Sequence, residues 1–470
     1  MKQSLQWGGR FTQPPDATLL AFGSSLEDDL VLAPFDVRCS HAHVEALRGG
    51  RIVTETQAHA LHAALDEVAW EIESGAFTEY ARSTKAEDVH GAIDARVRER
   101  CTGDAGEWLH AGRSRNDQVV TTLALYAHDR ASAGARRAIS IARSLLARAS
   151  SELDEGTLLA AVTHWQPAQP VSLAFWLLTA AEPFARAARR FAHAAVEAKR
   201  FCPLGSSAIA GSTLPLDRGS SSSYLGFEQP SRNAMDSIGT RDTLLDVAHA
   251  YVRATIDASR VAADLIVWAT PAYGYVQLGD ASSTGSSLMP QKRNPDPLEL
   301  VRAGASELSG AYAGALASLT GLPLSYHRDL QQTKKIGLQI VERGAAMLQA
   351  FELALADITF VRHAMNEHAG DGYTVATDIA DALVRSGVSA RRAHELVGEV
   401  VREAEKERRA LNQHDLAQLA AAAGLASLQA PVTAAESVNA KKTSGSTSPA
   451  AVQDALKQVG EELKEVELVL

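Results

Sequence analysis

Residues 117–151 read DQVVTTLALYAHDRASAGARRAISIARSLLARASS, without proline and with Gly134 as the one glycine. A run of about 35 residues of this kind predicts one helix of ~50 Å, because an α-helix rises about 1.5 Å per residue. Four further stretches have the same character and lie at 175–200, 241–270, 297–319 and 329–366. Helices of this length cannot bury their apolar faces singly, so they predict an elongated all-α bundle.

The sequence on either side of these helices predicts smaller, mostly helical domains. Residues 54–73 form one shorter helical pattern, which Thr54 and Gln57 begin as a capping box. The expected domains are 1–112 (N-terminal), 113–366 (central bundle) and 367–470 (C-terminal). Strand-like alternation is confined to short runs such as 275–278. Alanine and glycine are frequent on the long helices, which favours close packing between subunits as well as within one.

Composition bounds the class of protein. The chain has 470 residues, 46% of them apolar, and a net charge of -10. Interspersed charges and an acidic balance argue against nucleic acid as the main partner. No apolar run approaches the ~20 residues of a membrane span, and the N-terminus lacks the apolar region of a signal peptide. Cys39, Cys101 and Cys202 show no CxxC spacing, which predicts a reduced, cytoplasmic protein without disulfides or a zinc site.

Residues 284–295, TGSSLMPQKRNP, combine hydroxyl groups, a cation and a helix start. Asn294 and Pro295 are typical of an N-cap and a first helical position. Lys292 and the helix N-terminus both favour an anion, so a carboxylate could bind here. Serine is a poor base and would need donors aimed at its alkoxide. The loop should be mobile, because residues 280–284 hold no apolar anchor. A plain Gly/Ser linker between helices is the alternative.

Two more segments carry suitable side chains. Residues 109–117, LHAGRSRND, place two arginines, a serine and an asparagine where the longest helix begins, and such donors suit carboxylates. Solvated arginines at an ordinary helix start are the alternative. Residues 163–170, THWQPAQP, place His164 among hydroxyl and amide groups. A lone histidine is more often a satisfied structural residue than a catalyst.

These strings resemble known motifs. Residues 284–295 resemble the signature loop of the fumarase/aspartase superfamily, whose members release fumarate. Residues 112–118, GRSRNDQ, are similar to the hallmark of the argininosuccinate lyase family, and residues 163–170 match its Thr-His-x-Gln-x-Ala-Gln-Pro motif. The resemblance extends over essentially the whole chain, through matches at residues 7–11, 25–29, 87–90, 203–218, 377–381 and 393–395.

The resemblance implies a fumarase/aspartase-like fold and a carbon–nitrogen lyase. The expected reaction is anti elimination of fumarate from 2-(N-omega-L-arginino)succinate, which leaves L-arginine and is the last step of arginine biosynthesis. The resemblance makes Ser286 the base, while His164 and Glu299, which could also be an ordinary charge in the first turns of a helix, serve the acid side or orient the site. Catalytic Lys292 helps hold the succinate carboxylates. The other expected contacts to the succinate part are Ser114, Arg115, Asn116, Thr163 and Asn294. Those to the arginine part are Ser25, Asp29, Tyr326, Gln331 and Lys334.

The same resemblance implies a homotetramer whose active sites draw on three subunits. It implies no metal and no organic cofactor, because the substrate carboxylate already stabilises the carbanion. The chain departs from the family pattern at His327, Gln332, Thr333 and Thr240, and these departures bear on the leaving group. Two alternatives remain open: another fumarate-releasing C–N lyase that acts on a different N-substituted aspartate, and a non-catalytic structural protein on the same scaffold.

Overall fold

The computed structural model describes residues 16–84 and 86–470, and its fold is all-α, as predicted. The match at residues 7–11 lies outside the described residues. The predicted long helices form with bounds close to those expected, except for the last one. They are α7 (Arg115–Glu155), α8 (Leu173–Ala198), α11 (Asp242–Trp268), α12 (Asp296–Ala317) and α13 (Leu330–Ala356).

The chain forms two compact units, and each long helix contributes one part to each of them. Of the described residues, unit 1 contains those up to Ala133, Phe191–Val252 and Glu307–Gly344; unit 2 contains Gly134–Arg190, Arg253–Ser306 and Ala345–Leu470. The boundary between the two units falls inside each long helix, so the units are not the domains that the sequence predicts. The three-domain division expected from the sequence therefore stays a prediction.

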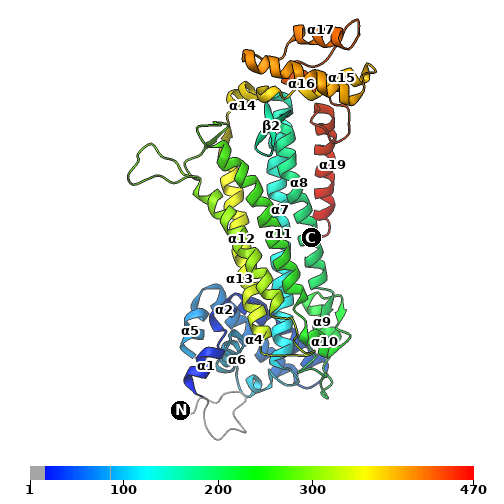
Figure 1. Cartoon of the computed structure of the whole chain (residues 1–470). Coiled ribbons are helices and arrows are strands. Elements are labelled where there is room, and N and C mark those ends of the chain that lie inside the picture. Colours follow the sequence, from blue (N-terminus) through cyan, green and yellow to red (C-terminus); the bar gives the residue numbers. More distant parts are fainter. Residues whose placement is uncertain (1–15, 85) are drawn as a thin grey trace. The chain divides into compact units, whose positions relative to one another are not determined.

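Unit 1 joins segments of the long helices to short helices (blue and green in Figure 1). Thr54 accepts a hydrogen bond from the Gln57 N–H, and the Gln57 side chain accepts one from the Thr54 N–H, so the predicted capping box forms. The short elements of the unit are α1 (Ala17–Gly23), α2 (Leu26–Asp29), η2 (Leu30–Leu32), α3 (Ala33–Gly49), α4 (Glu55–Glu73), α5 (Ala76–Thr84), α6 (Val89–Arg100), η3 (Ala105–Trp108), β3 (Phe201–Cys202), α9 (Arg218–Leu225), β4 (Gln229–Pro230) and α10 (Ala234–Gly239).

Unit 2 joins the remaining helix segments to two short antiparallel strand pairs and the C-terminal helices. Ile379, Leu383, Leu396 and Leu419 are central members of an apolar core shared by α15, α16 and α17. The short elements of the unit are β1 (Leu158–Thr163), β2 (Gln166–Ser172), β5 (Val276–Leu278), β6 (Ile358–Phe360), α14 (Arg362–His368), η4 (Asp371–Tyr373), α15 (Ala376–Arg385), α16 (Ala390–Glu407), α17 (Gln413–Ala422), α18 (Ala434–Ala440) and α19 (Pro449–Glu467).

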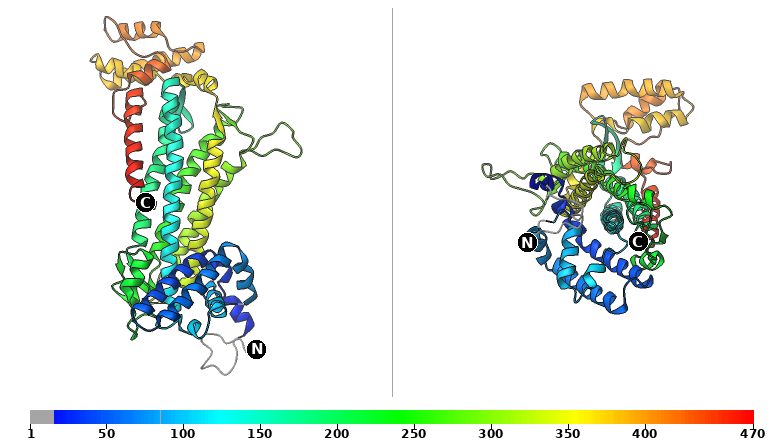
Figure 2. Two further views of the ribbon diagram at one scale, coloured as in Figure 1. Left: turned by 180° about the vertical axis from the view of Figure 1, so that it is seen from behind. Right: turned by 90° about the horizontal axis from the view of Figure 1, so that it is seen from below.

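Within each unit the long helices lie side by side and approach closely at glycines (Figures 1 and 2). In unit 1, a Cβ added at Gly337 of α13 would lie 2.7 Å from the Leu244 Cδ2 of α11, and one at Gly344 would lie 2.9 Å from the Tyr251 Cβ. In unit 2, a Cβ at Gly304 of α12 would lie 2.8 Å from the Met347 Sδ. Leu244 and Tyr251 leave no room for a larger side chain at Gly337 and Gly344, so these two glycines set the spacing of α11 and α13. The end of the Met347 side chain is flexible and could move to admit a methyl group at Gly304.

The helix predicted over 329–366 ends earlier, at Ala356, and this part of the prediction was wrong. Ile358–Phe360 instead pair with Val276–Leu278 as β6 and β5. The Arg148 guanidinium donates to the carbonyls of Ala356 and Ile358 at 3.1 and 3.4 Å, which satisfies carbonyls that a continuing helix would have used. The predicted strand near 275–278 thus exists, and its partner is what stops α13.

The hairpin of β1 and β2 was not predicted. Its two-residue turn consists of His164 and Trp165, with φ of 54° and 62°. Such turns normally carry Asn-Gly, which tolerates positive φ. A His-Trp pair gives no such signal.

The helices of residues 16–84 and 86–470 include none with the length and apolar character of a membrane span.

Replacing Gly337 with alanine should destabilise the protein by about 1–3 kcal/mol, because the new methyl group overpacks the fully buried Leu244. Gly398 of α16 is the matched control, since a Cβ there meets nothing within 4 Å. Gly398→Ala should be neutral or stabilise by up to about 1 kcal/mol, because alanine favours helix. Urea unfolding measures both, and an unchanged free energy of unfolding for Gly337→Ala would contradict this packing.

Candidate active site

The loop between β5 and α12 closes through a backbone bridge at its neck. The Thr284 N–H donates to the Asn294 carbonyl at 3.1 Å, and the Asn294 N–H donates to the Thr284 carbonyl at 2.8 Å. The Asp357 carboxylate accepts the Ser282 N–H at 2.8 Å, and Arg293 donates to the Leu278 carbonyl at 2.9 Å. Polar contacts therefore anchor the segment that the sequence shows to lack apolar anchors.

The tip of this loop presents Ser286 with its hydroxyl in a defined environment. Its Oγ accepts hydrogen bonds from the backbone N–H groups of Leu288 at 3.2 Å and Met289 at 3.0 Å. Two N–H donors on one hydroxyl oxygen favour negative charge on that oxygen. Lys292 is exposed and Leu288 is 83% exposed, and the loop projects away from the helices of its own unit (Figure 1).

Helix α12 begins at Asp296, directly after the loop. The Glu299 N–H donates to the Pro295 carbonyl at 3.1 Å, and the Thr284 hydroxyl donates to the Asp296 carboxylate at 2.5 Å. Asn294, expected as the N-cap, instead serves the neck bridge. Glu299 is exposed on the first turn, with one carboxylate oxygen 3.8 Å from the Arg302 guanidinium.

Thr163 and His164 lie at the tip of the β1–β2 hairpin. Both side chains are exposed, and Thr163 pairs with Gln166 across the turn. The hairpin is supported next to its turn, because Pro167 lies against Gly372, where an added Cβ would come within 2.9 Å of the proline Cβ. Among the described residues, no hydrogen bond or ion pair joins His164 to Glu299 or to Ser286.

In unit 1, the predicted residues Ser25, Asp29 and Lys334 are in direct contact. The Lys334 Nζ lies 2.6 Å from the Asp29 Oδ1, and the Ser25 hydroxyl donates to the Asp29 Oδ2 at 2.5 Å. Lys334 also donates to the Ser25 Oγ at 3.4 Å. Asp29 is fully buried and Lys334 is 5% exposed. The pair is therefore part of the protein interior in this state.

The neighbouring predicted residue Gln331 also contacts the N-terminal segment. Its side-chain amide donates to the Gly23 carbonyl at 3.1 Å, and Arg328 donates to the same carbonyl at 2.6 Å. Tyr326 is half-buried. Burial lowers the pKa of Arg241 to about 10. The start of α13 thus holds residues 23–29 in place.

Ser114, Arg115 and Asn116 lie at the start of α7, each with a local partner. The Ser114 Oγ accepts the Asn116 N–H at 3.2 Å, and Asn116 donates to the Ala208 carbonyl at 3.1 Å. The Arg115 guanidinium lies 3.2 Å from the Asp88 carboxylate and donates to the side-chain Oε1 of Gln118 at 2.7 Å. Burial would raise the pKa of Asp88, but the Arg115 charge holds it below the usual value.

Two carboxylates support this segment and were not among the predicted site residues. Asp88 caps α6 by accepting the Gly91 N–H at 2.7 Å, a pattern that the Asp-Val-His-Gly string could have indicated. Asp117 accepts the N–H groups of Ser114, Gly205 and Ser207 at 2.8–3.0 Å. Burial raises the pKa of Asp117 to about 6, while these N–H groups favour its ionised form.

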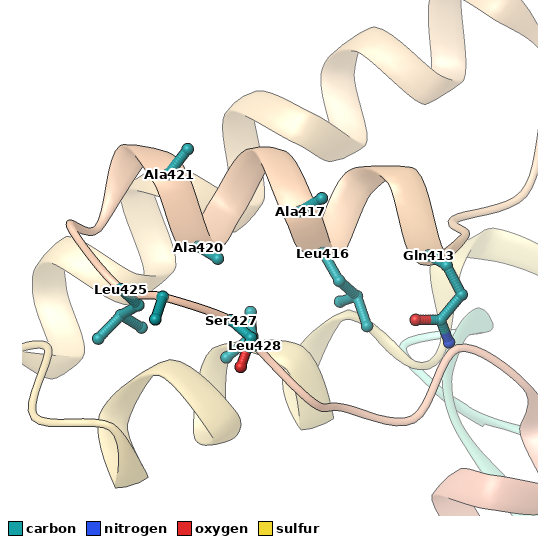
Figure 3. A pocket seen from close by; sticks show the side chains of 9 residues that line it. Gln413, Leu416, Ala417, Ala420, Ala421, Leu425, Ser427 and Leu428 are labelled. Carbon is teal, nitrogen blue, oxygen red and sulfur yellow. The ribbon is translucent and has the colours of Figure 1, made fainter.

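A separate pocket of about 330 Å³ lies beside α17 (Figure 3). Its lining consists of alanine and leucine side chains with Gln413 and Ser427. No lining residue can act as an acid or a base near neutral pH, so elimination chemistry has no place there.

Comparisons with known proteins bear on these motifs. Residues 9–310 match a family model described as Lyase, and residues 373–441 match one described as Argininosuccinate lyase C-terminal. The structure is similar to EDDS lyase in complex with formate (TM-score 0.78, 24% identity, 97% of this chain and 94% of that one). It is also similar to class II fumarase from Schistosoma mansoni (TM-score 0.66, 16% identity, 86% and 89%). These likenesses concern the fold.

Other proteins share more of their sequence with this chain than these two structures do. The chain is 38% identical to the argininosuccinate lyase of Mycolicibacterium paratuberculosis over 459 residues, which cover 96% of this chain and 95% of the relative. It is 40% identical to that of Nocardia farcinica over 403 residues, which cover 85% and 83%. The chain belongs to the argininosuccinate lyase family.

Proposed function

We propose that this carbon–nitrogen lyase eliminates fumarate from 2-(N-omega-L-arginino)succinate and releases L-arginine, the last step of arginine biosynthesis. Near full-length identity to argininosuccinate lyases supports the substrate. The observation that carries the chemistry is the Ser286 hydroxyl, whose oxygen already accepts two backbone N–H groups. Such donors reduce the free energy needed to form an alkoxide, which can then remove the proton beside a substrate carboxylate.

The acid side of the reaction is assigned to His164 and Glu299. His164 is exposed at the tip of a hairpin that is supported next to its turn, so its imidazole can reach a ligand while its backbone stays in place. In the proposed role it protonates the departing guanidino nitrogen or orients the group that does. Glu299, which is exposed on the first turn of α12, is assigned to orient this imidazole in the assembled site.

The succinate carboxylates are assigned to donors at three chain segments. Lys292 is exposed beside the start of α12, where the helix dipole adds to its attraction for anions. Arg115 offers a planar fork that suits a carboxylate, and Asp88 fixes its direction. The remaining donors proposed for these carboxylates are Asn294, Thr163, Ser114 and Asn116.

The arginine part of the substrate is assigned to Ser25, Asp29, Tyr326, Gln331 and Lys334. In this structure Lys334 is paired with Asp29 rather than open to solvent. Its proposed contact with the α-carboxylate of the arginine part therefore requires that the N-terminal segment shift or that the carboxylate join the existing pair.

Two of the departures from the family pattern have local structural roles. The Thr333 hydroxyl is buried and lies 2.6 Å from the Ser318 hydroxyl. The Thr240 Oγ accepts the Asp242 N–H at 3.1 Å and so caps α11. These positions serve helix packing and capping, which supports an unchanged leaving group. Gln332 is exposed, and nothing in the structure explains it.

We also propose a homotetramer with shared active sites. On α12, Leu300, Ala303, Gly310 and Gly314 share one face and are exposed, with Leu300 at 62%. An exposed face of small and apolar residues on a long helix supports close packing against another helix. A shared site would bring the loop and hairpin of unit 2 to the unit 1 residues of other chains.

We also propose that the chain has three domains, at 1–112, 113–366 and 367–470. A cytoplasmic location is proposed as well. Cys39, Cys101 and Cys202 are all free. Free thiols suit a reducing compartment.

Purified protein should convert argininosuccinate to equal amounts of arginine and fumarate, and Ser286→Ala should abolish this turnover. Its stability should change by no more than about 0.5 kcal/mol, as is usual for a change in a surface loop. Ser287→Ala is the matched control, because it removes the neighbouring exposed hydroxyl and should keep most activity. More than a tenth of wild-type turnover in Ser286→Ala would remove Ser286 as the base. Fumarate released only from other N-substituted aspartates would favour the related lyase.

Lys334→Met should weaken both stability and substrate use. It leaves the Asp29 carboxylate buried without its partner, which should cost about 3–5 kcal/mol of unfolding free energy. Loss of a charge-assisted contact worth ~1.5–3 kcal/mol should lower kcat/KM roughly ten- to hundred-fold. Inhibition by fumarate should be unchanged.

The control for that variant is the double substitution Asp29→Asn with Lys334→Met. It should recover much of the stability, because no unpaired charge remains, but it should not recover kcat/KM. A single variant with wild-type stability and kinetics would place the arginine contact elsewhere.

Mixing His164→Ala protein with Ser286→Ala protein should restore part of the activity once subunits exchange. Some sites then combine an intact loop from one chain with an intact hairpin from another. Exchange is checked independently by mass spectrometry of isotope-labelled subunits. Completed exchange without recovery would mean that each site takes both residues from one chain.

A further inference from the structure

Trp165 is a large apolar side chain in an unusual setting. It is 64% exposed and has a φ of 62°, next to His164 with a φ of 54°. Within the described part of the chain, these are the one adjacent pair of non-glycine residues with positive φ. Bulky residues adopt this conformation at a cost of the order of 1–3 kcal/mol, and such outliers cluster at functional sites. The two-residue turn accounts for the positive φ of both residues, but it does not account for a large apolar side chain exposed at the tip.

The substrate guanidinium has no exposed anionic partner among the residues assigned to the arginine part. This group is a planar cation at every physiological pH. The residues assigned to the succinate part are cations and hydrogen-bond donors, which suit carboxylates. Of the two acidic residues in the assigned set, Asp29 is fully buried and paired with Lys334 at 2.6 Å, and Glu299 belongs to the acid side.

We propose that the Trp165 indole stacks against the substrate guanidinium and selects for a planar, cationic leaving group. This inference rests on the proposed function. Tryptophan has the strongest cation–π attraction of the aromatic side chains, within about 6 Å of the ring centre. Guanidinium groups stack on aromatic faces more readily than ammonium groups do. The chain already uses this contact elsewhere, since the Arg96 guanidinium carbon lies 4.4 Å from the centre of the Tyr80 ring.

The position of Trp165 fits this role. It is the immediate neighbour of His164, whose proposed work is at the departing guanidino nitrogen. The two share the tip of one hairpin, and Pro167 against Gly372 supports the hairpin next to them. An exposed ring at that tip can meet the same nitrogen-rich group that the imidazole serves.

The test compares L-arginine with L-citrulline, a neutral isostere in which a urea oxygen replaces one guanidinium nitrogen. All titrations use the inactive Ser286→Ala background, so that arginine and fumarate cannot react. Calorimetric titrations with fumarate present then give the ratio of the two dissociation constants with Trp165 intact and with Trp165→Leu or Trp165→Phe added. Trp165→Leu should weaken arginine binding about five- to thirty-fold and leave citrulline binding nearly unchanged, so that the preference for arginine shrinks by that factor. Trp165→Phe should keep most of the preference, because it keeps an aromatic face.

Two results would contradict the proposed role of Trp165. If Trp165→Leu weakens both ligands equally, or dissociates the oligomer in sedimentation, then Trp165 has a structural or interface role and the inference is overturned. An unchanged preference overturns it as well. Wild-type turnover of argininosuccinate is measured in parallel, because its absence would refute the proposed function itself, whereas normal turnover with an unchanged preference refutes only the role of Trp165.

Discussion

The close approach of the long helices at glycines is the constraint on which the candidate site depends. Gly337 and Gly344 bring α13 against α11, and Gly304 of α12 lies against Met347 of α13. Thr163 and His164 lie on the hairpin that precedes α8, and Ser286 lies on the loop that precedes α12. The other predicted site residues, except Ser25 and Asp29, lie within a few residues of the start of α7, α12 or α13. Helix spacing therefore fixes where these starts lie, and small residues at the contacts fix the spacing.

The starts of the helices also divide the chemistry. The starts of α7 and α13 lie in unit 1, together with Ser114, Arg115 and Asn116 and with the Lys334–Asp29 pair. The starts of α8 and α12 lie in unit 2, where they follow the hairpin and the loop. Helix N-termini carry free N–H groups and partial positive charge, which suits a reaction that develops charge on carboxylates. A tetramer with shared sites would use both groups of residues at once.

Much of the fold follows from composition and periodicity. The bounds of α7, α8, α11 and α12 and the Thr54 capping box were predictable, because helices of this kind depend on local signals. The end of α13 was not, because Arg148 and β5, far away in sequence, stop it. The hairpin escaped because His-Trp is not a usual turn. For the site, sequence could name the residues, but the burial of Lys334 against Asp29 depends on tertiary packing that no motif encodes.

In the proposed mechanism, Ser286 acts on a substrate held between separate chains. A crystal structure of the Ser286→Ala variant with argininosuccinate bound would test it most directly. The succinate part should lie between residue 286 and Lys292 of one chain and Arg115 of another, with the carbon that loses its proton facing residue 286. Succinate bound within a single chain, or bound away from residue 286, would contradict it.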